Sequence, residues 1–217
     1  MRVLAALVLI PVAIGVAYAG GWLWAALVGV VSVGLFVEWI MIVGAQRPGW
    51  IALGVVYALA ALLASIAVRL DPVWGFSALM FVLLVVWMTD IGGYFAGRGI
   101  GGPKLWPRVS PKKTWAGAIG GLVLSVAVAI GFAIGGVGRP GTLIAIAVVL
   151  TVLSQLGDLA ESAVKRRFGV KDSSHIIPGH GGLLDRLDGY VFAIVAAAVI
   201  GFFHGGADGV GRGLMVW

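Results

Sequence analysis

Long apolar segments, separated by short polar stretches, dominate the chain. A helix needs about 20 mostly apolar residues to cross a bilayer, and seven segments approach that length. They are residues 2–19, 22–43, 50–68, 73–95, 115–135, 142–163 and 190–203. This pattern predicts an all-α integral membrane protein, a polytopic helical bundle of about seven transmembrane helices.

Composition supports this class and sets limits on the chemistry. The 217 residues are 61% hydrophobic and only 11% charged, with a mean hydropathy of +1.09, which excludes an ordinary soluble domain. There is no cysteine, so disulfides and thiolate metal sites are excluded. The 35 glycines suit close packing between helices in lipid.

No boundary divides the chain, so we interpret residues 1–217 as a single membrane-embedded domain. Residues 1–80 are N-terminal spans, and residues 81–190 form the catalytic region with two basic loops, 96–114 and 164–188. The first apolar run, followed by "AYAG", is also typical of a cleaved signal peptide. Only two residues separate it from the next span, which favours an uncleaved hairpin. The glycine-rich tail from residue 204 is predicted to be a frayed end.

The basic residues indicate an orientation. With seven spans and a cytoplasmic N-terminus, only Arg69, Arg139 and Arg212 of the 15 basic residues fall outside, as the positive-inside rule requires. Both basic loops then face the cytoplasm of a bacterial-type inner membrane. The net charge of +6 implies anionic partners such as phosphates, lipid headgroups or nucleotides.

The first polar stretch is "WMTDIGGYFAGRGIGGPKLWPRVSPKKTWAG", residues 87–117. Asp90 lies in the last turns of an apolar span, where an ionisable group needs a partner or a role. Ser110, Lys112, Lys113 and Thr114 come directly before a predicted helix, whose free amides suit phosphate. A plain positive-inside loop explains the five cations of this stretch, but it does not explain Asp90.

The second stretch, "GDLAESAVKRRFGVKD", places acids and a cation on one helical face. Asp158, Glu161 and Lys165 are spaced by three or four residues. Lys165 can compensate the carboxylates in a structural ion pair. A divalent cation is the alternative, and hard oxygen ligands favour Mg²⁺ over zinc.

The third stretch, "GHGGLLDRLDG", carries Asp185 and Asp188 around Arg186. Carboxylate pairs that recruit Mg²⁺ beside phosphate-binding cations are the working parts of phosphoryl-type transfer, whereas helix capping explains one aspartate at most. His180 is a candidate base or phosphate contact, or a hydrogen-bonding loop residue. Glu38, in the second span, either pairs with a loop cation or is packed and hydrogen-bonded.

The segment "SAVKRRFGVKDSSHIIPGHGGLLDRLD" resembles the signature of the phosphatidate cytidylyltransferase (CDP-diacylglycerol synthase) family. "GDLAES", "SPKKTWAG" and "WMTDIGGYFAGR" resemble other landmarks of that family. The resemblance implies an enzyme that joins CTP to phosphatidic acid in the membrane, releasing pyrophosphate, with Mg²⁺ as cofactor and no nucleic-acid partner. It leaves a homodimer open. The implied metal ligands are Asp158, Asp185 and Asp188, and they are catalytic together with Lys165. The implied phosphate-binding residues are Lys165, Arg166, Lys171 and Arg186, while Ser110, Lys113 and Thr114 form a second phosphate-binding wall. Asp90 and His180 are grouped with the substrate-binding residues.

Two departures from the family pattern are visible. Ala116 stands where members usually have Glu, and the chain is shorter than typical members between Glu38 and Trp50. Two other classes stay open from the residues alone. One is an ion or anion transporter, with acids lining a path, and the other is a different CTP-dependent lipid transferase or kinase-like enzyme.

Overall fold

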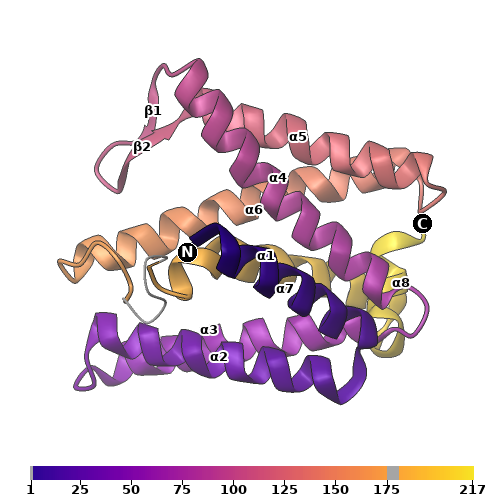
Figure 1. The fold of residues 1–217 in the computed structure, drawn as a ribbon, viewed down its shortest axis with the longest axis horizontal. Helices are drawn as coiled ribbons and strands as arrows, with labels where there is room; N and C mark the ends of the chain where they lie inside the picture. The colour runs from indigo at the N-terminus through magenta and orange to yellow at the C-terminus, as the bar shows by residue number, and fades with distance from the viewer. Residues whose placement is uncertain (1, 175–180) are drawn as a thin grey trace.

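The computed structural model describes the backbone of residues 2–174 and 181–217, and the side chains from residue 10 onward within those ranges. Helices account for most of it (Figure 1). The elements are α1 (Arg2–Ala19), α2 (Gly21–Val43), α3 (Pro48–Leu70), α4 (Gly75–Gly99), β1 (Lys104–Trp106), β2 (Ser110–Thr114), α5 (Trp115–Ile134), α6 (Pro140–Arg167), α7 (Leu184–Gly205), the 3-10 turn η1 (Ala207–Gly209) and α8 (Val210–Met215). The predicted all-α polytopic bundle is confirmed.

Six of these helices, α2 to α7, are long and apolar enough to cross a membrane, counted over the described residues. Each coincides with a predicted span. The first predicted span is also helical, but only Ile10–Ala19 of α1 enters the count, and that part is too short for a crossing. The protein is therefore a multi-pass membrane protein with six candidate spans in the described residues, against about seven predicted.

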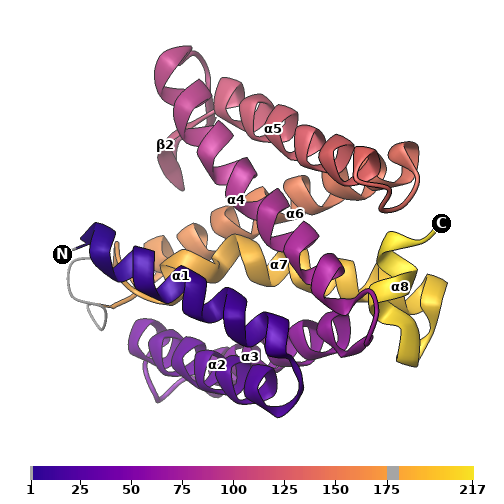
Figure 2. The same cartoon turned by 45° about the vertical axis from the view of Figure 1, so that its right-hand side comes forward.

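The helices form two groups joined through α6 and α7. In Figures 1 and 2, α2 and α3 run side by side along one side of the molecule, α4 and α5 lie on the other, and α6 and α7 lie between them. A buried apolar core joins the groups, with Phe81 and Leu79 of α4 meeting Leu150 of α6 and Ile194 of α7. Because these helices pack together, residues that are far apart in sequence come close to one another at the helix ends.

Helices α4 and α5 approach each other at backbone distance. Each carries a Gly-x-x-x-Gly pair, Gly93 with Gly97 and Gly117 with Gly121. A Cβ atom placed on Gly117 would lie 2.8 Å from the Gly93 carbonyl oxygen. Small residues let helices approach each other closely in lipid. The glycines of α4 and α5 therefore specify the contact between these two helices.

The two predicted basic loops are shorter than expected, because helices take up their ends. Helix α4 continues to Gly99, and an antiparallel hairpin of β1 and β2 follows it, with Lys104 paired to Thr114. Helix α6 continues to Arg167, and α7 begins at Leu184. Most cations of the two segments therefore sit on helix ends and on a hairpin.

The prediction of a frayed C-terminal tail is wrong. Residues 207–215 form η1 and α8, which pack against α7, α4 and α3, and Leu214 and Met215 are fully buried. The Asp71 carboxylate accepts a hydrogen bond from the Arg212 amide at 3.0 Å, and Trp217 stacks on His204. The apolar residues at the end of this tail are buried against other helices, which the high glycine content of the tail did not indicate.

Candidate active site

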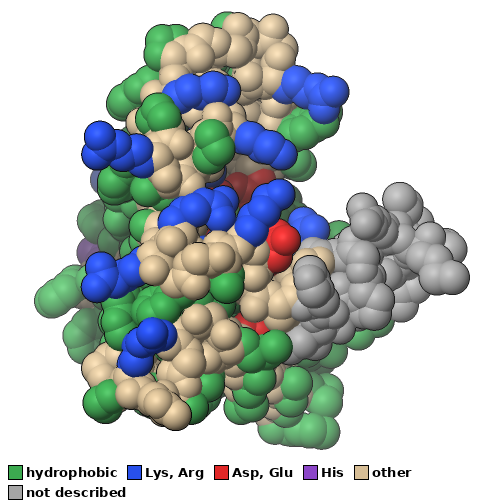
Figure 3. All heavy atoms as spheres, turned by 90° about the vertical axis from the view of Figure 1, so that its left-hand side faces the viewer, with side chains coloured by type: hydrophobic (Ala, Val, Ile, Leu, Met, Phe, Trp, Pro, Cys, Tyr) green, Lys and Arg blue, Asp and Glu red, His purple; other side chains and the backbone are tan. Residues whose placement is uncertain are grey.

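One end of the bundle collects most of the charge. The α2–α3 turn, the β1–β2 hairpin and the C-terminal end of α6 all lie at the left of Figure 1. Viewed from that side, Lys and Arg side chains are spread across the face, and acidic side chains lie among them (Figure 3). The predicted cation-rich segments thus share one end of the molecule.

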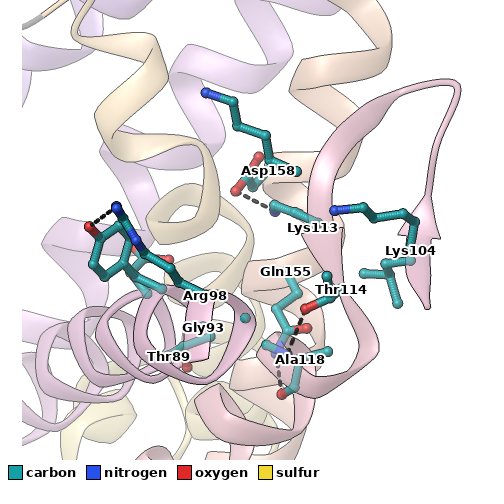
Figure 4. A pocket seen from close by; sticks show the side chains of 15 residues that line it. Thr89, Gly93, Arg98, Lys104, Lys113, Thr114, Ala118, Gln155 and Asp158 are labelled. Atoms are coloured by element: carbon teal, nitrogen blue, oxygen red, sulfur yellow. Dashed lines mark hydrogen bonds and ion pairs between the residues drawn. The ribbon is translucent and has the colours of Figure 1, made fainter. Parts of the chain in front are cut away.

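A cavity of about 580 Å³ opens at this end, between α4, α5, α6 and the hairpin (Figure 4). Of the predicted site residues, Asp90, Lys113, Thr114 and Asp158 line it. Ser110 lies on β2 but is not among its lining residues, and neither is Ala116. The cavity therefore brings the first polar stretch and the start of the second together in space.

Several lining residues were missed from the sequence, although a periodic signal was present. In α4, the lining positions Asp90, Gly93, Tyr94, Gly97 and Arg98 repeat every three or four residues, which is one helical face. Arg98 donates a hydrogen bond to the Tyr94 hydroxyl at 3.0 Å. Extending the helical face beyond Asp90 would have identified Arg98.

The hairpin contributes Lys104, a cation that the predicted site lacked, together with Lys112, which the sequence placed among the residues before the helix. Lys104 on β1 and Lys112 on β2 both line the cavity, and both side chains are exposed. The antiparallel pairing of the strands places Lys104 beside the Lys112–Thr114 segment. Hydropathy carries no signal for this pairing, because the hairpin is short and polar.

Thr114 has a local structural role in addition to its place on the wall. It is the N-cap of α5, and its hydroxyl accepts a hydrogen bond from the Gly117 amide at 3.1 Å. Serine and threonine hydroxyls satisfy helix amides in this way. One of the free amides on which the predicted phosphate site depended is therefore already used.

Asp158 and Lys113 form an ion pair across the cavity wall (Figure 4). Their side chains are 33% and 27% exposed respectively, so both groups remain accessible to a ligand. Asp90 lies within electrostatic range of both. The cavity therefore presents carboxylates and ammonium groups together, as a metal-bound polyphosphate requires.

Helices α6 and α7 come together beside this ion pair. A Cβ atom on Gly157 would lie 2.7 Å from the Asp188 carbonyl oxygen, and one on Gly189 would lie 2.5 Å from the Ser154 hydroxyl. Each glycine is next to an acid in sequence, so the close approach brings Asp158 and Asp188 within electrostatic range. Two of the three implied metal ligands, Asp158 and Asp188, therefore interact across the α6–α7 contact.

Lys165 is enclosed between two other acids. Its ammonium group lies 2.7 Å from a Glu161 oxygen and forms a short ion pair with Asp185. All three side chains are at most 18% exposed. Lys165 thus compensates the carboxylates of α6 and α7, as the structural interpretation of the second stretch proposed.

The Asp185 carboxylate has little capacity left for another ligand. One oxygen receives Lys165, and the other accepts hydrogen bonds from the Ser173 amide and hydroxyl, both at 3.0 Å, and from the Gly182 amide at 3.2 Å. Of the implied metal ligands, Asp185 is the one already saturated by protein donors. Its role as a ligand stays a prediction.

The remaining predicted cations lie on the surface of the same end. Arg166, Lys171 and Arg186 are exposed, and Arg166 donates to the Val170 carbonyl oxygen at 3.0 Å. None of the three lines the cavity. His180 lies outside the described residues.

Within the described ranges, no three His, Asp or Glu side chains are arranged as a preformed metal-binding group. Asp158, which lines the cavity, and Asp188, on the neighbouring helix α7 and outside the cavity lining, nevertheless fit a hard cation, because carboxylate oxygens are the ligands that such a cation prefers. Together with the cavity cations, they can bind a metal-bound phosphate chain and neutralise its charge. Such an arrangement suits transfer of a phosphorus-containing group.

Comparison with known proteins points to the same chemistry. Residues 45–204 match the model of the Cytidylyltransferase family. The chain is 43% identical over 203 residues to the phosphatidate cytidylyltransferase of Brucella suis biovar 1 (strain 1330), an alignment that covers 85% of this chain and 72% of the relative. It is 40% identical over 151 residues to the Bacillus subtilis (strain 168) protein of the same name, covering 69% and 56% respectively. The corresponding protein of Haemophilus influenzae is 44% identical over 140 residues, covering 61% and 48%.

Proposed function

Because the chain belongs to the cytidylyltransferase family, we propose that it is a nucleotidyltransferase that converts CTP and phosphatidic acid to CDP-diacylglycerol and pyrophosphate in phospholipid biosynthesis. A phosphate oxygen of phosphatidic acid attacks the α-phosphorus of CTP. The bond from the α-phosphorus to the oxygen that bridges to the β-phosphorus breaks, and that oxygen leaves with pyrophosphate. The attacking oxygen is already ionised, so the reaction needs positioning and charge neutralisation more than a general base.

The cavity is the observation that carries this proposal. It combines the cations Arg98, Lys104, Lys112 and Lys113 with the acids Asp90 and Asp158, at the end of a membrane-spanning bundle. A water-soluble triphosphate can reach such a cavity from the aqueous side. We assign CTP to it, with its phosphates against the lysines.

We assign a magnesium ion to Asp158 and Asp188. When bound, Mg²⁺ supplies positive charge for the phosphate oxygens of the nucleotide. Lys113 holds Asp158 at the cavity wall and is itself placed to bind a phosphate oxygen. Lys165 keeps Glu161 and Asp185 compensated beside these residues, so the acids of α6 and α7 tolerate one another.

Phosphatidic acid approaches from the bilayer. Its acyl chains stay between the lipids, and its phosphate lies at headgroup depth, where the ends of the spans carry Arg166, Lys171 and Arg186. We propose that these exposed cations guide the lipid phosphate toward the cavity. With the cation-rich end on the cytoplasmic side, as the positive-inside rule favours, both substrates reach the site in the inner membrane from their own phase.

A label-transfer assay tests the function. The purified protein in detergent is incubated with phosphatidic acid, Mg²⁺ and CTP labelled with ³²P at either the α or the γ position. We expect α label in the lipid product, γ label only in pyrophosphate, and no transfer when EDTA removes the metal. Lipid labelled only from the γ position would identify a kinase, and no transfer from either position would contradict the proposal.

A further inference from the structure

Glu38 of α2 is a fully buried acid with two hydrogen bonds on each of its carboxylate oxygens. Its side chain is 0% exposed. One carboxylate oxygen accepts from the Ser174 hydroxyl at 2.6 Å and from the Leu183 amide at 2.8 Å. The other accepts from the Ser173 hydroxyl and the Leu184 amide, both at 2.8 Å. A buried carboxylate is tolerated because all four interactions compensate its charge.

These four donors come from both sides of the α6–α7 connection. Ser173 and Ser174 follow α6, whereas Leu183 and Leu184 stand at the start of α7. Amides in the first turn of a helix have no partner within that helix, and a negative charge there is favourable. Glu38 therefore caps α7 from a different helix, 145 residues away in sequence for Leu183.

Close packing around the carboxylate is built into the sequence at residue 182. A Cβ atom placed on Gly182 would lie 1.7 Å from the Ser173 hydroxyl and 2.5 Å from a Glu38 oxygen. No residue with a side chain fits this position without displacing one of these groups. The contact is thus specified by Glu38 and by a glycine of the third polar stretch.

The Ser173 hydroxyl connects Glu38 to the charged cluster of the site. Its single proton is shared between a Glu38 oxygen at 2.8 Å and an Asp185 oxygen at 3.0 Å. Asp185 in turn forms the ion pair with Lys165. A continuous series of polar contacts therefore runs from α2 through α7 to α6, although Glu38 does not line the cavity.

We propose that Glu38 is a positioning residue for the transfer reaction. It fixes the start of α7, and through Ser173 it fixes Asp185 and Lys165, so that the acids of α7 face those of α6. This inference rests on the proposed function, but its structural part does not need turnover to be tested. Glu38 acts through these residues and contacts neither nucleotide nor metal.

Glu38→Gln is the informative change because it preserves shape. The amide retains one acceptor oxygen, and its NH₂ group then faces one of the two backbone N–H groups of α7. A buried donor left against another donor is costly. We expect kcat to fall about 10- to 100-fold, while the affinity for CTP, whose cavity lies against α4, α5 and α6, stays within about twofold. Glu38→Asp retains the charge, and we expect it to recover part of kcat.

Hydrogen exchange followed by mass spectrometry provides the second readout. In Glu38→Gln, peptides that contain Leu183 and Leu184 are expected to take up deuterium faster than in the parent protein, whereas peptides from α4 are unchanged. Ser32→Ala is the matched control. Its hydroxyl, on the same helix, is buried without a hydrogen-bond partner among the described residues, so both exchange and kcat should stay at parental values.

The outcomes separate this inference from the proposed function. A parent protein without cytidylyl transfer contradicts the function, and the exchange data then still decide whether Glu38 holds α7. An active parent with kcat within twofold in Glu38→Gln overturns the positioning role alone. Loss of CTP affinity in parallel with kcat would also overturn it, since that result indicates general destabilisation.

Discussion

The two groups of charged side chains at the cationic end differ in how fully their hydrogen-bonding capacity is used. Around the cavity, the side chains of Asp158 and Lys113 are 33% and 27% exposed, and beyond their mutual ion pair Asp158 accepts one long hydrogen bond, from the Ser162 hydroxyl at 3.4 Å. At the start of α7, Asp185 is surrounded by Lys165 and three protein donors. The first group remains accessible to a ligand, whereas the second is enclosed by protein donors and stabilises the arrangement that presents the first.

This difference predicts that activity and stability separate between the two groups. A change at Asp158 or Lys113, the open group, should remove activity and leave the fold intact. A change at Asp185 or Lys165, the saturated group, should lower both activity and stability, because a buried charge loses its partner. The following variants test that distinction in order of their expected effect on turnover.

Asp158→Asn should have the largest effect. The substitution removes a charge from the position assigned to the metal-bound triphosphate, and we expect the rate of CDP-diacylglycerol formation to fall by about 1,000-fold. A pair this exposed contributes only about 0–1 kcal/mol to stability, so the melting temperature in detergent should change little. Label-transfer rates and thermal unfolding measure the two quantities. Activity within tenfold of the parent would remove Asp158 from the metal site.

Asp185→Asn should lower turnover and stability together. The neutral side chain leaves Lys165 with Glu161 as its only acidic partner in an enclosed position, and breaking a buried pair on one side costs about 3–5 kcal/mol. We expect activity to fall by about 100-fold or more and the melting temperature to drop clearly. Loss of activity with an unchanged melting temperature would contradict the division, because Asp185 would then behave like Asp158.

Lys104→Gln should produce a smaller effect, confined to nucleotide binding. The exposed ammonium group of Lys104 lines the cavity, where we assign a phosphate contact. Loss of one charge-assisted contact of about 1.5 kcal/mol corresponds to a roughly tenfold increase in KM for CTP. We expect kcat and the melting temperature to remain near parental values. Arg108→Gln, on the same hairpin but outside the cavity lining, is the control and should leave KM unchanged.

The sequence predicted most of the fold because long apolar runs carry a strong signal. It misplaced the ends of α4 and α6, since cations in the last turns of these helices resemble loop residues. The hairpin and α8 were missed because short elements depend on tertiary packing. For the site, the spacing of Glu161 and Lys165 predicted a shared helical face, and the two side chains form an ion pair there. The partners of Glu38 were beyond prediction, because they lie 135 or more residues away and meet only when α2 packs beside α7.

Gly120→Ala sharpens the comparison from the side of packing. A Cβ atom at Gly120 would lie 2.3 Å from the Ala96 Cβ and 2.9 Å from the Gly92 carbonyl oxygen, so α4 and α5 must separate. Overpacking of this kind typically costs about 1–3 kcal/mol, which thermal unfolding in detergent can measure. Turnover at a temperature below the transition should stay within about threefold of the parent, since no charged group is lost and the cost is spread over a packing interface.

Gly131→Ala is the matched control in the same helix. A Cβ atom there meets nothing within 4 Å, so the added methyl group points into open space. Alanine is also the better helix former by about 1 kcal/mol, and stability should therefore be equal or slightly higher. Equal destabilisation by the two substitutions would show that the close approach of α4 and α5 does not stabilise the fold. A lower stability of Gly120→Ala alone, with turnover retained, would establish that glycine packing between α4 and α5 stabilises the bundle without taking part in the chemistry of the open group.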